Sequence, residues 1–215
     1  MTPTPHSRYA GQNHRQIVGV EEVVARSDLV LLAEPDDALP ALVAGLDFHP
    51  GQFVVHCSGR YGVGVLAEAQ AKGALPLALH PAMTLTGTSL DAERLSGAPF
   101  GVTAPEPLRM AAEALVVEMG GEPVWIPEEA RPLYHAALAH SANHLITLVA
   151  SGAEILENAG VESPARLLAP LLQASLDNAL RMGYPALTGP VVRGDAQTVA
   201  AHVAALAPDP QVQAA

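Results

Sequence analysis

Short apolar runs alternate with longer amphipathic stretches through the first 126 residues of the chain. The residues of each run are apolar in succession, which is typical of parallel strands buried on both faces. Strands joined by helix-length connections form βαβ crossovers, so the pattern predicts a parallel, doubly wound α/β sheet. The predicted strands are 29–33, 53–56, 77–80, 100–103 and 124–126, and the predicted helices between them are 37–46, 64–72 and 106–119.

Beyond Pro127 this alternation stops and three helical stretches follow. The stretches are 128–158, 164–181 with Pro170 inside it, and 195–206 with Asp195 at its start. We expect the proline to kink or break its helix and the aspartate to cap its own. The change of pattern predicts two domains, 1–127 and 128–215. Many helical positions are alanine, so each helix buries little, and we expect a second copy of the chain to complete the core of a homodimer.

Composition and charge narrow the range of partners. Twenty-two acidic residues against 11 basic ones give a net charge of −11, which makes nucleic acid and anionic lipid unfavourable partners. The longest apolar stretch, 145–150, is far shorter than the roughly 20 residues of a membrane span. Residues 1–16 lack the apolar region of a secretory signal, and the single Cys57 cannot form an internal disulfide. We therefore expect a cytoplasmic protein that acts on a small molecule.

Polar residues follow three of the predicted strands. Ala33–Asp37 follows the first, His56–Gly59 ends the second, and His80–Thr84 ends the third. Open α/β sheets bind ligands at the carboxyl ends of their strands, because side chains and helix N-termini converge there. Each segment also has a structural alternative. The first can hold an aspartate N-cap, the second a serine that caps the following helix, and the third a turn that proline makes rigid.

The connection between the last two helices is a further candidate. Residues 186–195 contain Gly-Pro and Arg-Gly-Asp sequences, and plain turn chemistry accounts for their glycines and proline. It leaves Thr188 and Arg193 unexplained. Arg193 could pair with a substrate carboxylate or phosphate, or with a neighbouring acid.

The first helix of the second half carries four polar residues of interest, His135, His140, Asn143 and His144. His140 and His144 have the i, i+4 spacing of two metal ligands, but no glutamate lies between them and no third ligand is evident, so we expect no metal site. His135 and Asn143 are about 12 Å apart along a helix and cannot contact one atom. His135 is either a structural histidine or an acid/base group.

Together these segments resemble a bacterial family of Rossmann-like proteins with a C-terminal helical domain of unknown function. The helical part is similar in layout to that of 6-phosphogluconate dehydrogenase. The resemblance covers Val20 to Leu206. Its carriers are Asp28–Leu32 with Pro35–Asp37, Val55–Gly59, Leu79–Pro81, Tyr134–Ala137 with Asn143, and Leu187–Pro190 with Arg193–Asp195. More distant relatives by architecture are the pyrroline-5-carboxylate reductases and hydroxyisobutyrate dehydrogenases, which transfer hydride from a nicotinamide cofactor and dimerise through the helical domain.

The resemblance implies an oxidoreductase that uses NADP, or NAD, on a small-molecule substrate. It implies a proton donor or acceptor at His135, with Asn143 and Thr188 orienting the substrate and Arg193 binding it. The cofactor-binding residues that it implies are Ala33, Pro35, Ser58, Gly59 and His80.

Three departures from the family pattern modify this expectation. No apolar strand and Gly-x-Gly-x-x-Gly turn stand ahead of Glu21, so we expect a truncated Rossmann-like domain with impaired cofactor binding. Glu34 is an acid where the family tends to be uncharged. The hydroxyisobutyrate dehydrogenase relatives carry a lysine on the long helix as proton donor, whereas the only lysine of this chain, Lys72, lies outside that helix. The alternative function is therefore a non-catalytic dimerisation or ligand-sensing module, and a fragment that aggregates through an open sheet edge is a third possibility.

Overall fold

The structure is a computed structural model that describes residues 18–206 of the 215. The prediction of a truncated domain depends on the residues ahead of Glu21, and residues 1–17 lie outside the described part of the chain. The chain divides into two compact units, one up to His140 and one from Ser141 onward.

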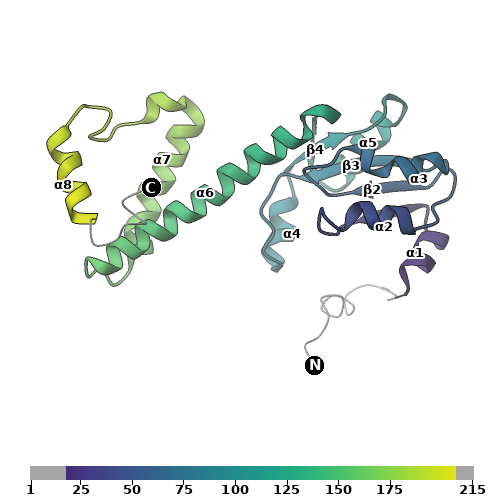
Figure 1. Ribbon diagram of the computed structural model, residues 1–215, viewed down its shortest axis with the longest axis horizontal. Coiled ribbons are helices and arrows are strands. Elements are labelled where there is room, and N and C mark those ends of the chain that lie inside the picture. The colour runs from purple at the N-terminus through teal and green to yellow at the C-terminus, as the bar shows by residue number, and fades with distance from the viewer. Residues whose placement is uncertain (1–17, 207–215) are drawn as a thin grey trace. The chain divides into compact units, whose positions relative to one another are not determined.

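The first unit contains a five-stranded sheet in the order β1-β2-β3-β4-β5 (Figure 1). The strands are β1 (Leu29–Leu32), β2 (Phe53–His56), β3 (Leu75–Pro81), β4 (Pro99–Thr103) and β5 (Glu122–Trp125). β1, β2 and β3 pair in parallel, as do β4 and β5, which confirms the predicted α/β sheet. The pairing of β3 with β4 is antiparallel. The sequence does not predict this reversal, because a strand buried on both faces has the same apolar pattern in either direction.

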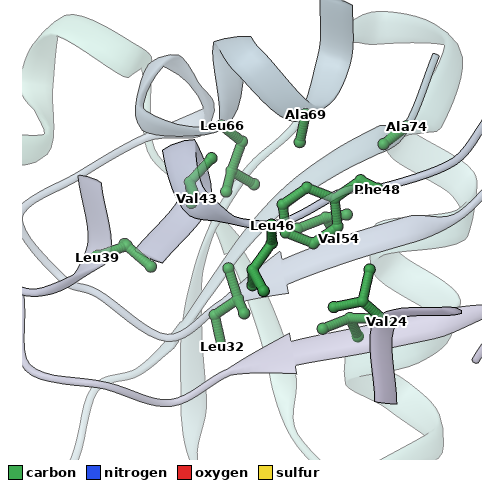
Figure 2. Close-up of a cluster of buried hydrophobic side chains, with 11 residues drawn as sticks. Val24, Leu32, Leu39, Val43, Leu46, Phe48, Val54, Leu66, Ala69 and Ala74 are labelled. Carbon is green, nitrogen blue, oxygen red and sulfur yellow. The ribbon is translucent and has the colours of Figure 1, made fainter. Parts of the chain in front are cut away.

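Helices pack on both faces of the sheet. They are α1 (Val20–Arg26), α2 (Leu39–Gly45), α3 (Ala67–Ala71) continuing the 3-10 turn η2 (Val63–Leu66), α4 (Ser89–Leu95), and α5 (Arg109–Glu118) after η3 (Glu106–Leu108). One core cluster joins α1, α2 and α3 to β1 and β2 and includes Val24, Val43 and Val54 (Figure 2). A second cluster includes Val55 of β2 and Val116 of α5. Adjacent residues of β2 thus enter opposite cores, as expected for a strand covered on both sides.

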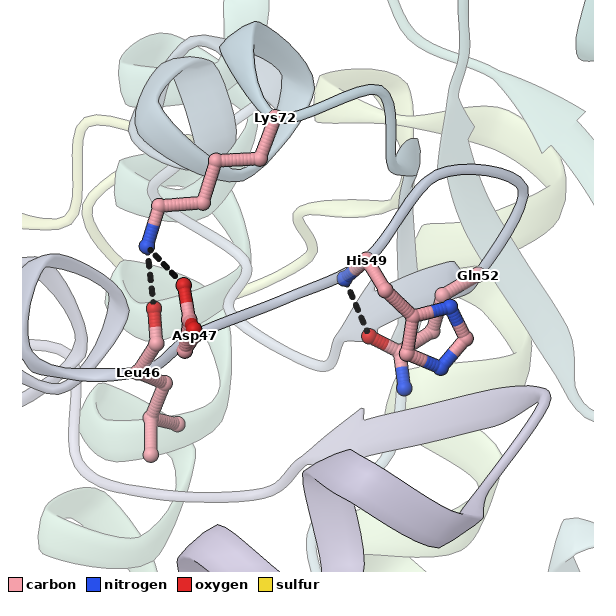
Figure 3. Close-up of polar contacts among 5 residues, drawn as sticks. All are labelled: Leu46, Asp47, His49, Gln52 and Lys72. Carbon is pink, nitrogen blue, oxygen red and sulfur yellow. Dashed lines mark hydrogen bonds and ion pairs between the residues drawn. The ribbon is translucent and has the colours of Figure 1, made fainter.

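Polar contacts fix the edge of the sheet at which β2 begins. The Gln52 amide donates to the carbonyl oxygens of Val24 and Ser27, at 2.7 Å each. The Lys72 ammonium donates to the Leu46 carbonyl at 2.8 Å and forms an ion pair with Asp47 at 3.1 Å (Figure 3). The only lysine of the chain therefore anchors a loop at the amino end of β2.

The second unit is helical. Its helices are the greater part of α6 (Arg131–Asn158), which follows η4 (Glu128–Ala130), then α7 (Pro164–Met182), the short η5 (Tyr184–Ala186) and α8 (Ala196–Leu206). Asp195 caps α8 as predicted, accepting the Thr198 N–H at 3.1 Å. α7 continues through Pro170, so the break that we considered there does not occur. Of the helices in the described range, none has the length and apolar character needed to cross a membrane.

Candidate functional site

Three rings meet beyond the carboxyl end of β2. In the β2–β3 register His56 pairs with Ala78, so β3 runs on past the end of β2 and carries His80 beyond it. His80 Nδ1 lies 2.8 Å from the Tyr134 hydroxyl. The His80 ring is edge-on to Tyr134 at 5.6 Å and to His135 at 6.1 Å between centroids. The first turn of α6 thereby presents two consecutive side chains to the end of β3.

The rings of His80 and His135 pack closely against Gly59. A Cβ atom at Gly59 would lie 2.8 Å from His80 Nε2 and 2.8 Å from His135 Cδ2, closer than real Cβ contacts allow. The sequence therefore correctly places Gly59 and His80 at neighbouring strand ends, and the structure brings His135 to them. Both histidines are partly exposed, whereas Gly59 is buried.

Replacing Gly59 with alanine tests this close approach. We expect the free energy of unfolding to fall by about 1–3 kcal/mol, because the added methyl overpacks both imidazoles. Denaturant unfolding measures the change. Gly45→Ala is the matched control, since a Cβ at Gly45 meets no atom within 4 Å. Equal effects of the two substitutions would show that the rings do not converge on Gly59.

Arg131 holds the first turn of α6 against the sheet. Its side chain is completely buried. Nη2 donates to the carbonyls of Ala78 at 3.0 Å and Gly101 at 2.9 Å, and Nε donates to Thr103 Oγ1 at 2.7 Å. Burial lowers the pKa of this guanidinium. Sequence analysis missed Arg131, because nothing in the pattern distinguishes it from a surface arginine at the start of a helix.

His56 is a structural histidine with a defined tautomer. Its Nδ1 accepts the Ser58 N–H at 3.2 Å, so the hydrogen is on Nε2, which donates to the Gly62 carbonyl at 2.8 Å. Burial is the main cause that lowers the pKa of His56 to about 4, and the nearby Arg131 charge lowers it further. His56 therefore stays neutral at pH 7 and has no free nitrogen for catalysis.

The buried His56 predicts acid-sensitive stability. Its pKa is about 4 in the folded state and about 6.5 in the unfolded chain, so the unfolded state binds more protons between these values and stability falls as pH falls through this window. We expect His56 to contribute about 2 kcal/mol to the loss of stability between pH 7 and pH 5, and His80, whose pKa is also lowered to about 4, to add to it. Urea unfolding at both values measures it, with His56→Gln as the variant that should reduce the difference. If the free energy of unfolding of His56→Gln differs between the two pH values as much as that of the wild type, His56 is not the titrating group.

The other predicted residues of the first unit lie in the loops that follow β1 and β2. Ser58 Oγ accepts the N–H groups of Arg60 at 3.2 Å and Tyr61 at 3.1 Å. Ser58 thus stabilises its own loop and does not cap the following helix. Ala33 and Pro35 are exposed immediately after β1.

The expected aspartate N-cap on α2 is wrong. The N-cap is Ala38, whose N–H closes a turn on the Pro35 carbonyl at 2.9 Å. A proline in the first turn of α2 reduces the number of N–H groups that need a cap. Asp37 instead faces Arg60, with 3.7 Å between charged atoms.

Three predicted residues belong to the second unit. Asn143, Thr188 and Arg193 are all exposed. Thr188 lines a pocket of about 610 Å³ together with Asn178 and Tyr184. The roles that the sequence predicts for these residues stay predictions. Within residues 18–206, no group of three or more histidine, cysteine, aspartate or glutamate side chains is placed to hold a metal ion.

A second glycine-containing turn was missed by sequence analysis. Gly62-Val63-Gly64-Val65-Leu66-Ala67 has the Gly-x-Gly-x-x-Ala spacing, follows a parallel strand and opens a helical segment, which is the context of a phosphate-binding turn. Its N–H groups are already engaged, because the Glu128 carboxylate accepts those of Val63 at 2.8 Å and Gly64 at 2.9 Å. An internal carboxylate thus occupies the donors that such a turn offers to an anion.

Family comparison agrees with this architecture. The pattern of the Rossmann-like domain matches residues 9–81. The pattern of a domain of unknown function, DUF2520, matches residues 98–215, more than half of the chain. The chain belongs to the DUF2520 family. No curated protein matches this DUF2520 chain.

Solved structures share the fold of the DUF2520 chain. A candidate NADP oxidoreductase from Bacteroides fragilis has a TM-score of 0.68 and 21% identity, covering 86% of this chain and 71% of that one. A reductive aminase from Aspergillus terreus, in complex with NADPH and ethyl-5-oxohexanoate, has a TM-score of 0.64 and 18% identity, with coverage of 90% and 72%. The 1-pyrroline-5-carboxylate reductase of Streptococcus pyogenes has a TM-score of 0.58 and 14% identity, with coverage of 90% and 74%. The predicted architectural relationship to such reductases is confirmed at the level of the fold.

Proposed function

We propose that the DUF2520 chain is an NADP-dependent oxidoreductase that transfers hydride to or from a small-molecule substrate. One observation carries the proposal, namely the convergence of His80 and His135 on the bare backbone of Gly59 at the carboxyl end of β2. Open α/β sheets bind ligands at the carboxyl ends of their strands, and His80 and His135 are partly exposed polar side chains at this end. The fold is one that NADPH-bound reductases share.

The described residues fit one end of a nicotinamide dinucleotide. The imidazoles of His80 and His135 fill the space at Gly59, so a flat ring would lie beside them, with His80 as a hydrogen-bonding group and His135 as the group that moves a proton. The turn at Gly62–Ala67 does not fit the pyrophosphate in this state, because Glu128 holds its donors. When bound, the nicotinamide supplies or accepts the hydride. His135 gives the accompanying proton to the substrate in reduction and takes it back in oxidation.

Calorimetry with NADPH and NADH tests the proposal on the full chain. We expect NADPH to bind, and to bind more tightly than NADH. The variant Gly45→Ala, in which the added methyl contacts no other atom, should bind NADPH with the affinity of the wild type. Absence of binding by either nucleotide would contradict the oxidoreductase.

We propose that the chain forms a homodimer through its C-terminal helices. We also propose that it lies in the cytoplasm, where Cys57 stays a thiol. Large apolar side chains of the second unit are exposed, among them Leu171 at 62%, Leu180 at 80% and Val191 at 76%. Pro164 is the only buried residue between 141 and 206. A second copy would cover this surface, and sedimentation equilibrium would report a monomer if it does not.

The alternative is a non-catalytic dimerisation or ligand-sensing module. The contact of Glu128 with Val63 and Gly64 favours it, because this contact removes donors that a dinucleotide phosphate could use. Under this alternative NADPH leaves the melting temperature unchanged, whereas a bound nucleotide raises it.

A further inference from the structure

The Tyr134 hydroxyl makes the one polar contact that the His80 ring has within residues 18–206. The two heavy atoms, Tyr134 Oη and His80 Nδ1, are 2.8 Å apart. A phenol is a far stronger acid than a neutral imidazole N–H, and an imidazole nitrogen is a stronger base than a phenol oxygen. The hydroxyl therefore donates to Nδ1. A neutral imidazole has one ring hydrogen, so that of His80 is on Nε2.

The Nε2 atom of His80 lies against Gly59 and is open to solvent, since no buried side-chain nitrogen among the described residues lacks a hydrogen-bond partner. It would lie 2.8 Å from a Cβ at Gly59, at the point where His135 Cδ2 also converges. Burial lowers the pKa of His80 to about 4, and the Arg131 and His135 charges act in the same direction. His80 thus presents a neutral N–H at pH 7.

We infer that Tyr134 is a positioning residue that keeps the ring hydrogen of His80 on Nε2, and that this N–H donates to a carbonyl oxygen of the bound ligand. The second part rests on the proposed function, which supplies two such oxygens. One is that of the nicotinamide carboxamide, and the other is that of a ketone substrate. The opposite tautomer would present a lone pair to the ligand and repel either oxygen.

The tautomer can be measured without any ligand. Nitrogen-15 NMR of the full chain, labelled at histidine, distinguishes a protonated ring nitrogen from an unprotonated one. In the wild type at pH 7 we expect His80 to be protonated at Nε2 only, and in Tyr134→Phe to be a mixture of both tautomers. His56 is the internal control, because the Ser58 N–H and the Gly62 carbonyl fix its tautomer in both proteins. His80→Phe assigns the resonances by removing them.

Two results would overturn the positioning role. One is a wild-type His80 protonated at Nδ1. The other is an unchanged single tautomer in Tyr134→Phe while His56 also stays unchanged. A Tyr134→Phe protein in which His56 changes has lost its local fold. The wild-type tautomer then decides, because protonation at Nδ1 overturns the role and protonation at Nε2 alone supports it.

Addition of ligand identifies the acceptor. NADPH is added first and ethyl-5-oxohexanoate second, while the His80 Nε2–H proton resonance is followed. A downfield shift on addition of NADPH identifies the carboxamide, and a shift only on addition of the keto ester identifies a substrate carbonyl. If NADPH is the partner, His80→Phe should weaken its binding about tenfold and His80→Gln should restore part of the loss. No shift in either step, with NADPH shown to bind by calorimetry, overturns the carbonyl contact. Failure of NADPH to bind contradicts the proposed function and leaves the tautomer result standing.

Discussion

Replacing Arg131 with methionine is expected to lower the free energy of unfolding by about 3–5 kcal/mol. The guanidinium is buried and donates to the carbonyls of Ser58, Ala78 and Gly101 and to the Thr103 hydroxyl oxygen, so a methionine leaves four buried acceptors without this donor. Denaturant unfolding of both proteins at pH 7 measures the change.

Arg26→Met is the control for this substitution. Arg26 makes an exposed ion pair with Glu22, and its side chain is 66% exposed. Pairs of this kind contribute about 0–1 kcal/mol. A loss of less than about 1 kcal/mol in Arg131→Met would contradict the view that this arginine fastens α6 to the sheet.

Replacing His135 with phenylalanine is expected to lower kcat about 10²- to 10⁴-fold, because the group that moves the proton is removed while its ring shape is kept. NADPH oxidation with a ketone or imine that the wild type reduces measures the effect. NADPH affinity should stay within about threefold of the wild type, because His135 acts in the proton transfer and not in binding the cofactor.

His49→Phe is the matched control for His135. His49 precedes β2, at the opposite end of that strand from Gly59, and its removal should leave kcat unchanged. An unchanged kcat in His135→Phe would assign the proton to another group.

The apolar pattern was sufficient to predict the layers of the fold. Continuous runs such as Val54-Val55 identify strands buried on both faces, and the structure places these two residues in opposite cores. Strand direction was not predictable, because the β3–β4 reversal depends on where the intervening chain returns to the sheet. The long helix was predicted for 128–158 and spans Arg131–Asn158 after the 3-10 turn η4; its proline, Pro132, stands in the first turn, where it does not break a helix.

The candidate site was predictable only in part. Gly59 and His80 follow from one rule, since neighbouring parallel strands end at the same edge of a sheet. Arg131 and Glu128 did not follow from any rule, because both contacts join residues more than 25 positions apart. A polar side chain that satisfies backbone groups of a distant strand has no local signature.

The central claim is that the nicotinamide ring lies beside His80 and His135 at the carboxyl end of the sheet. Proton NMR of the full chain with NADPH tests it through nuclear Overhauser contacts from the nicotinamide ring protons. The account predicts contacts to the ring protons of both histidines and none to those of His49. Bound NADPH whose nicotinamide protons contact neither His80 nor His135 would contradict it.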